Sequence, residues 1–256
     1  MELNTDFMIQ TFSLLAKGLP VTLGLTALSL FLSAGPAFWI ALRRMQRKGA
    51  GARAAGLYVS FIRGTPMILQ ILLMYSLLPS ALNIFVKSAG IPLNVFDQVN
   101  PFWYACVIFT LNTAALLSEV FRSAILSIPS GQMEAGLSVG LTRWQTYRKI
   151  ILPQAMSVAV PSICNITVNL IKGTSLAFLM GVKDILAVAK IQASYGYNYI
   201  EAYLDVFLVY IILCTVIQLF FRYAEKWRPL PDRTVRRDFF CLQYIISPSH
   251  FMGNRF

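Results

Sequence analysis

Five long apolar stretches constrain the fold of this sequence more than any other feature. They cover approximately residues 19–42, 57–78, 102–125, 155–180 and 203–221. Because about 20 apolar residues are enough for a helix to cross the hydrocarbon core of a bilayer, each stretch can span a membrane. Only 13% of the 256 residues are charged, compared with roughly 25% in soluble domains. We therefore expect an all-α polytopic membrane helical bundle with five transmembrane helices.

The second stretch contains a helix-breaking sequence in its first half. Arg63-Gly64-Thr65-Pro66 places a charge and a proline there, and proline removes a backbone donor and clashes with the preceding turn. We expect this helix to be kinked or to start late.

The charges divide unequally between the two sides of this topology. The formal net charge of +11 would suggest nucleic acid as a partner of a soluble protein. Here, segments 43–63, 122–149 and 222–256 hold 17 basic and four acidic residues, whereas the opposite side holds four basic and six acidic residues. By the positive-inside rule, the N-terminus lies outside and the C-terminus is cytoplasmic. Membrane orientation thus explains the charge, and no nucleic acid is expected.

The sequence offers little for catalysis or metal binding. Its four cysteines are far apart and its single histidine, His250, lies near the C-terminus, so neither a metal site nor an enzyme active site is expected. A phosphate-binding GxxxxGK[ST] loop does not occur. We expect no cofactor on this chain.

The polar segment between the third and fourth stretches predicts two short helices. Ser130 is placed to cap a helix of about residues 132–139, Gly140 to end it, and Thr142 to cap a second helix that runs to Pro153. Such an amphipathic elbow either lies on lipid or provides a docking site for a cytoplasmic partner.

The same segment carries a family resemblance. Glu134-Ala135-Gly136, Gly140 and Ile151-Leu152-Pro153 resemble the EAA motif of ATP-binding-cassette importer permeases. Four further segments are similar to the polar amino acid branch of that family, whose members include histidine-, glutamine-, arginine- and cystine-type permeases: RGTPMILQ at 63–70, SEVFRSAILSIPSGQ at 118–132, LPQAM at 152–156 and KGTSLAFLMGV at 172–182.

The resemblance implies a domain organisation and a set of partners. It implies an importer transmembrane domain over residues 1–228, with a coupling loop at about 130–153, and a cytoplasmic tail of unknown role at 229–256. The expected partners are an ATP-binding subunit that carries ATP and Mg, a second permease (the same or a related chain), and a periplasmic or extracellular solute-binding protein. The expected location is the bacterial cytoplasmic (inner) membrane. Residues implied in ATPase coupling are Glu134, Ala135, Gly136, Gly140, Leu141, Leu152 and Pro153.

Two positions depart from the family pattern. Gly136 stands where the motif usually has alanine, which should loosen the helix by about 1 kcal/mol. Gly173 stands where the branch typically has aspartate, so Lys172 would lack its usual neighbouring carboxylate.

Polar residues repeat at helical spacing in two of the apolar stretches. Asn112, Glu119 and Arg122 share one face of the third, and Ser162, Asn165, Asn169 and Lys172 share one face of the fourth. These stripes either line a path for a zwitterionic solute or only join helices. Candidate path residues are Asn112, Glu119, Asn165, Asn169, Lys172, Thr174 and Ser175.

The charged members of these stripes suggest specific pairings. We expect Glu119 to form a structural ion pair with Arg122 or Arg63, both placed near the cytoplasmic ends where they can snorkel. A further hypothesis is that Lys172 and Glu119 compensate each other electrostatically. Thr174 and Ser175 should mark an irregular turn near the outer mouth, where they either meet solute or cap a helix.

Together these features indicate the transmembrane permease subunit of an importer that moves a polar amino acid inward with energy from a separate ATPase. The alternative is a gradient-driven secondary amino acid transporter. The sequence shows no inverted pair of half-spans, which such transporters commonly contain.

Overall fold

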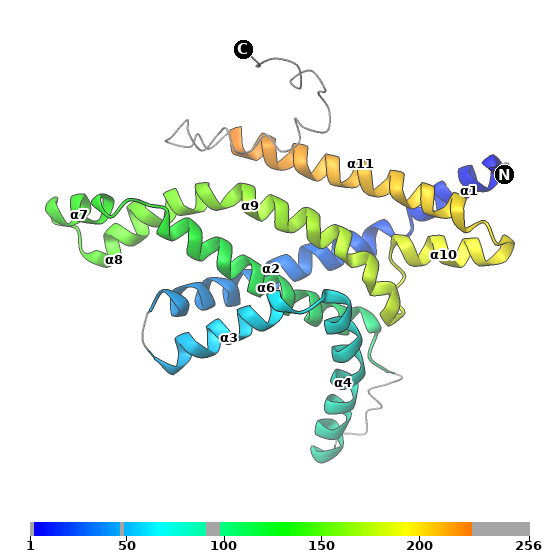
Figure 1. Ribbon diagram of the computed structural model, residues 1–256, viewed down its shortest axis with the longest axis horizontal. Coiled ribbons are helices and arrows are strands. Elements are labelled where there is room, and N and C mark those ends of the chain that lie inside the picture. The colour runs from blue at the N-terminus through cyan, green and yellow to red at the C-terminus, as the bar shows by residue number, and fades with distance from the viewer. Residues whose placement is uncertain (1–2, 47–48, 91–97, 227–256) are drawn as a thin grey trace, which may run out of the picture.

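The computed structural model describes residues 3–46, 49–90 and 98–226, and every regular element in them is helical (Figure 1). The predicted tail at 229–256 lies outside the described residues. The helices are α1 (Thr5–Leu15), α2 (Leu19–Met45), α3 (Ala50–Gly64), α4 (Met67–Ser88), α6 (Pro101–Leu126), α7 (Gly131–Ser138), α8 (Arg143–Thr146), a π-helical turn (Tyr147–Ile151), α9 (Leu152–Gly173), a 3-10 segment (Thr174–Met180), α10 (Ile185–Gly196) and α11 (Tyr199–Lys226).

Five helical segments of the described chain are long and apolar enough to cross a membrane. They are α2, α4, α6, the continuous run Arg143–Met180 and α11. The all-α, five-span prediction is therefore confirmed. The fourth span is longer than expected because α8 and the π-helical turn lead into α9 without a break.

The second span starts late, at Met67, which is one of the two expected alternatives, although it does not form one helix over residues 57–78. The chain forms two helices, α3 and α4, which are separated at Thr65 and Pro66. Thr65 is extended (φ −116°, ψ 142°), as expected for a residue before proline. In Figure 1, α3 lies alongside α2, whereas α4 projects away from the bundle. The break therefore redirects the chain and does not merely bend a helix.

Small side chains allow the central helices to pack closely. Ser29, Ser33, Ala37 and Ala41 recur every fourth residue along α2, and all four are buried. Small residues at this spacing let helix backbones approach in a membrane, where hydrophobicity alone does not drive helices together. The helix they face, α6, contributes Ala114, among others, to the same core and is the most enclosed span.

Two helices at one end of the bundle were not predicted. The short helices α1 and α10 both pack against α11. Asn4 caps α1 by accepting from the Phe7 N–H (3.0 Å), and Asp184 caps α10 by accepting from Ala187 N–H (2.9 Å). A Cβ on Gly18 would lie 2.7 Å from the Ile185 backbone, so a glycine is needed where α2 begins against α10.

Candidate functional site

The segment between α6 and α9 forms a compact elbow at the end of the bundle opposite α1 and α10 (Figure 1). Its first helix, α7, ends before Gly140, whose φ of +84° favours glycine. The second, α8, begins at a capping box: Thr142 Oγ1 accepts from Gln145 N–H (3.2 Å), and Gln145 Oε1 accepts from Thr142 N–H (2.9 Å). Ser130 precedes α7 as expected, but its side chain makes no capping hydrogen bond.

Gly136 holds the two arms of the elbow together. It is buried, and a Cβ at this position would lie 2.4 Å from Thr146 Cγ2 and 2.6 Å from Thr146 Oγ1. The Thr146 side chain therefore occupies the space that alanine would need. The expected loss of helix propensity is therefore only one effect of Gly136. The glycine also permits close packing of α7 on α8.

The remaining elbow residues present an outward surface. Glu134, Ala135, Leu137, Val139 and Trp144 are exposed. Of the other residues expected in coupling, Leu141 and Leu152 are half-buried, and Gly140 and Pro153 are exposed. The elbow thus presents exposed apolar side chains and the Glu134 carboxylate, together with exposed Arg143, Arg148 and Lys149, while packing of Gly136 on Thr146 holds its two arms together.

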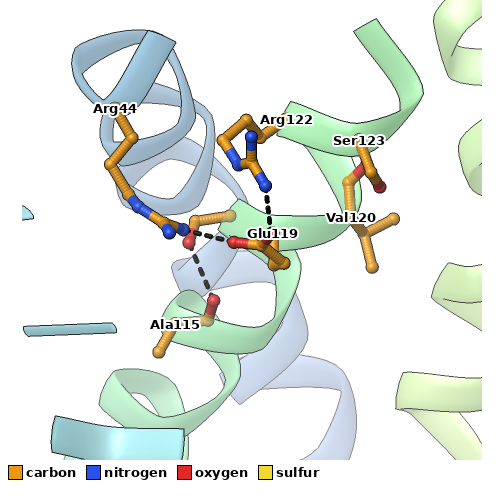
Figure 2. A network of polar contacts seen from close by, with 7 residues as sticks. Arg44, Ala115, Glu119, Val120, Arg122 and Ser123 are labelled. Carbon is orange, nitrogen blue, oxygen red and sulfur yellow. Dashed lines mark hydrogen bonds and ion pairs between the residues drawn. The ribbon is translucent and has the colours of Figure 1, made fainter. Parts of the chain in front are cut away.

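Glu119 sits in a three-residue ion cluster between α2 and α6 (Figure 2). Its Oε2 accepts from Arg44 Nη1 and its Oε1 accepts from Arg122 Nη2. All three side chains are partly buried, so the pairs are shielded from bulk water. The structure thus brings Arg122 to Glu119. Arg44, which sequence reasoning missed, takes the place expected for Arg63.

The proposed compensation of Glu119 by Lys172 is not what the structure shows. Both carboxylate oxygens are engaged by arginines, and Lys172 is exposed on α9. Glu119 therefore joins α2 to α6 through its two arginine partners.

Asn112 joins helices through Gln70, a residue that sequence reasoning missed. Its Nδ2 donates to Gln70 Oε1 (2.8 Å), which links α6 to α4. Gln70 Nε2 donates in turn to the carbonyl of Ile62 (2.8 Å) and to Thr65 Oγ1 (2.7 Å). Because Pro66 has no N–H, the Ile62 carbonyl would otherwise lack the donor that a continuing helix would supply. The amide of Gln70 therefore fixes the α3–α4 break onto α6.

The polar stripe on α9 stays exposed in the described part of the chain. Ser162, Asn165, Asn169 and Lys172 are all exposed, while Val168 and Ile171 on the other side of the helix are buried. The fold thus turns this polar face away from its own core. A membrane protein places such a face toward water or toward another protein.

The segment after α9 approaches the α3–α4 break. Gly173 lies where a Cβ would be 3.5 Å from Met67 Sδ and 3.8 Å from Phe109. Thr174 is buried and donates to the Ile171 carbonyl (2.6 Å), and Ser175 donates to the Lys172 carbonyl (2.7 Å). Both hydroxyls therefore bond to their own backbone, in the 3-10 segment that forms the predicted irregular turn.

Arg63 lies deeper than the cytoplasmic end at which it was expected. Its neighbours Ile62 and Thr65 line a cavity together with Ile108 and Leu111 of α6. These two residues are the eighth and eleventh of the 26 in α6. Arg63 is therefore closer to the level of the middle of α6 than to that of its end at Leu126.

The fold and these motifs can be compared with known proteins. A family model described as "binding-protein-dependent transport system inner membrane component" matches residues 35–228. The chain belongs to this family. It is therefore a multi-pass membrane component of a transport system, as the resemblance of its motifs indicated.

Relatives of this transport component cover nearly its whole length. It is 34% identical to the "probable amino-acid permease protein YxeN" of Bacillus subtilis, over 91% of this chain and 99% of that protein. It is 36% identical to the "probable amino-acid ABC transporter permease protein PatM" of Vibrio harveyi, over 86% and 95%.

Solved structures share the architecture of this transport component. A chain from the "crystal structure of an amino acid ABC transporter with histidines" superposes with a TM-score of 0.74 at 26% identity, covering 88% of this chain and 99% of the other. A chain of the MetNI methionine ABC transporter gives a TM-score of 0.63 at 21% identity, over 83% and 95%, which shows a shared fold.

Proposed function

We propose that this chain is the permease subunit of an ATP-driven amino acid importer. The transported solute is a polar amino acid, delivered by a solute-binding protein and moved inward by a separate ATPase that binds ATP and Mg. The relatives described above as amino acid permeases support this substrate class. The proposed location is the bacterial inner membrane, and residues 1–228 form the transport domain.

The observation that carries the energy-coupling part is the elbow. Its outer surface is exposed, while Gly136, the capping box and Thr146 fix its two arms to each other. A rigid element of this kind can transmit a push from a docked ATPase to α6 and α9, the helices that it joins. We assign docking to the predicted coupling residues, with Glu134 at the contact.

The exposed stripe on α9 supports a paired assembly. A path for a polar solute must be closed to lipid on all sides, and one chain leaves Asn165, Asn169 and Lys172 uncovered. A second permease facing this stripe would enclose the path. Ser175 lies next to it, whereas buried Thr174 supports the turn.

The charge distribution supports an orientation with the N-terminus outside and the elbow in the cytoplasm. If Arg63 is not counted among the cytoplasmic charges, 16 basic and four acidic residues remain on that side. The excess of positive charge that the positive-inside rule requires therefore persists.

Substitution of Glu134 tests the coupling role. In proteoliposomes that contain the permease, the ATPase and the binding protein, Glu134→Lys should assemble normally yet abolish uptake and binding-protein-stimulated ATP hydrolysis. Gln46→Lys is the matched control, because Gln46 is exposed, directly follows α2 and lies outside the elbow. Wild-type uptake by Glu134→Lys would refute docking at this residue.

A further inference from the structure

Arg63 is a positive charge that the fold places at mid-membrane depth. The α3–α4 break around it is fixed to the middle of α6, because Tyr58 Oη donates to the Leu111 carbonyl and Gln70 accepts from Asn112. Asn112 is the twelfth of 26 residues in α6, and about 21 Å of helix separates it from the end at Leu126.

Nothing in the described part of the chain neutralises Arg63. Its side chain is exposed and makes no ion pair, hydrogen bond or cation-π contact there. Glu119, the acidic residue of α6, already binds Arg44 and Arg122. An arginine in the hydrocarbon region is costly unless it faces a cavity or an anionic partner.

Hydrogen bonds from Gln70 fix the backbone on both sides of Arg63. Gln70 Nε2 donates to the Ile62 carbonyl (2.8 Å) and to the Thr65 carbonyl (3.1 Å), which lie on either side of Arg63 in the chain. Gly64 leaves room beside the backbone at the break, because no atom lies within 4 Å of a Cβ built at this position. The backbone on both sides of Arg63 is thus held in place, while its guanidinium is exposed and unpaired within the described residues.

We propose that Arg63 binds the carboxylate of the amino acid as it passes through the membrane. A guanidinium matches a carboxylate in a two-bond geometry, and an α-carboxylate is common to the free amino acids in the proposed substrate class. Gln70 is the positioning residue, since its amide fixes the backbone on both sides of Arg63. This inference rests on the proposed function.

The test compares each amino acid with its α-carboxamide. The purified permease–ATPase complex is titrated with L-arginine, L-glutamine and L-histidine and with L-argininamide, L-glutaminamide and L-histidinamide. For the amino acid that the wild type binds, we expect binding about 10-fold or more tighter than to its amide, as a charge-assisted hydrogen bond would give.

Variants of Arg63 should lower this ratio selectively. Arg63→Gln should reduce it to less than about 3-fold, and Arg63→Lys should give an intermediate ratio because it keeps the charge but loses the two-bond geometry. Arg53→Gln is the matched control, since Arg53 is exposed at the start of the same helix, and it should leave the ratio unchanged.

Three results separate the alternatives. A wild-type ratio retained in Arg63→Gln would overturn the proposal. Dissociation of the Arg63→Gln complex into single permeases, measured by its mass, would also overturn it and assign Arg63 to the contact between permeases. Failure of the wild type to transport any amino acid would instead remove the proposed function on which this inference rests.

Discussion

Addition of one methyl group at Gly136 gives a sharp test of how the elbow is built. Alanine improves helix propensity by about 1 kcal/mol over glycine, so sequence alone predicts that Gly136→Ala stabilises α7. In the structure, however, the new Cβ would lie 2.4 Å from Thr146 Cγ2 and 2.6 Å from Thr146 Oγ1. Overpacking of this kind costs about 1–3 kcal/mol. We therefore expect net destabilisation of up to about 2 kcal/mol.

Thr146→Ala should relieve this clash. It removes the two nearest atoms, so that the next nearest is the Thr146 Cβ, at 3.0 Å. By itself it removes the hydrogen bond from Thr146 Oγ1 to the Thr142 carbonyl (3.0 Å), at a cost of about 1 kcal/mol. In the double variant the two changes should compensate each other, with a coupling of about 1–2 kcal/mol.

The assay is the melting temperature of the solubilised permease–ATPase complex, together with its binding-protein-stimulated ATP hydrolysis. Gly136→Ala should lower both, and addition of Thr146→Ala should restore both. Gly131→Ala is the control: it adds the same methyl group to α7, where no atom lies within 4 Å, and should not destabilise. Strictly additive effects of Gly136→Ala and Thr146→Ala would refute the packing argument.

Three other substitutions test the fold. Burial raises the pKa of Asp184 from 3.8 to about 6, so the native chain binds more protons and loses stability as pH rises from about 4 to about 6. Asp184→Asn keeps a capping acceptor and should flatten this slope in melting curves; an unchanged slope would contradict the assignment. Glu119→Gln should destabilise the complex by about 1–3 kcal/mol because two partly buried arginines lose their counter-charge, and an unchanged melting temperature would argue against the cluster. Gln70→Leu should lower the melting temperature by leaving the Ile62 carbonyl unpaired, whereas Gln10→Leu, at an exposed position of α1, should not.

The spans were predictable because membrane crossing depends on local apolar length. Residues 19–42 and 102–125 were expected, and α2 (Leu19–Met45) and α6 (Pro101–Leu126) cover them with three and two extra residues, respectively. The end of the first elbow helix and the start of the second followed equally from local signals at Gly140 and Thr142, whereas the expected end of the second at Pro153 was wrong because the helix continues into α9. In both cases the decisive interactions are a few residues apart in the chain.

The contacts between distant segments were not predictable from spacing. Arg44 lies 75 residues from Glu119 and Gln70 lies 42 residues from Asn112, so helical periodicity says nothing of their pairing. Helices α1 and α10 were missed because they are too short to give a span signal. The position of Arg63 relative to α6 depended on α3 ending at Gly64 and on the break being fixed to α6.

ATP-dependent uptake of radiolabelled amino acids into proteoliposomes tests the central claim most directly. The vesicles contain the permease, its ATPase and the binding protein, with ATP supplied on the ATPase side. The account predicts that uptake of a polar amino acid requires both ATP and the binding protein and persists when proton and sodium gradients are collapsed. Uptake that follows a proton or sodium gradient without ATP would contradict it and identify a secondary transporter.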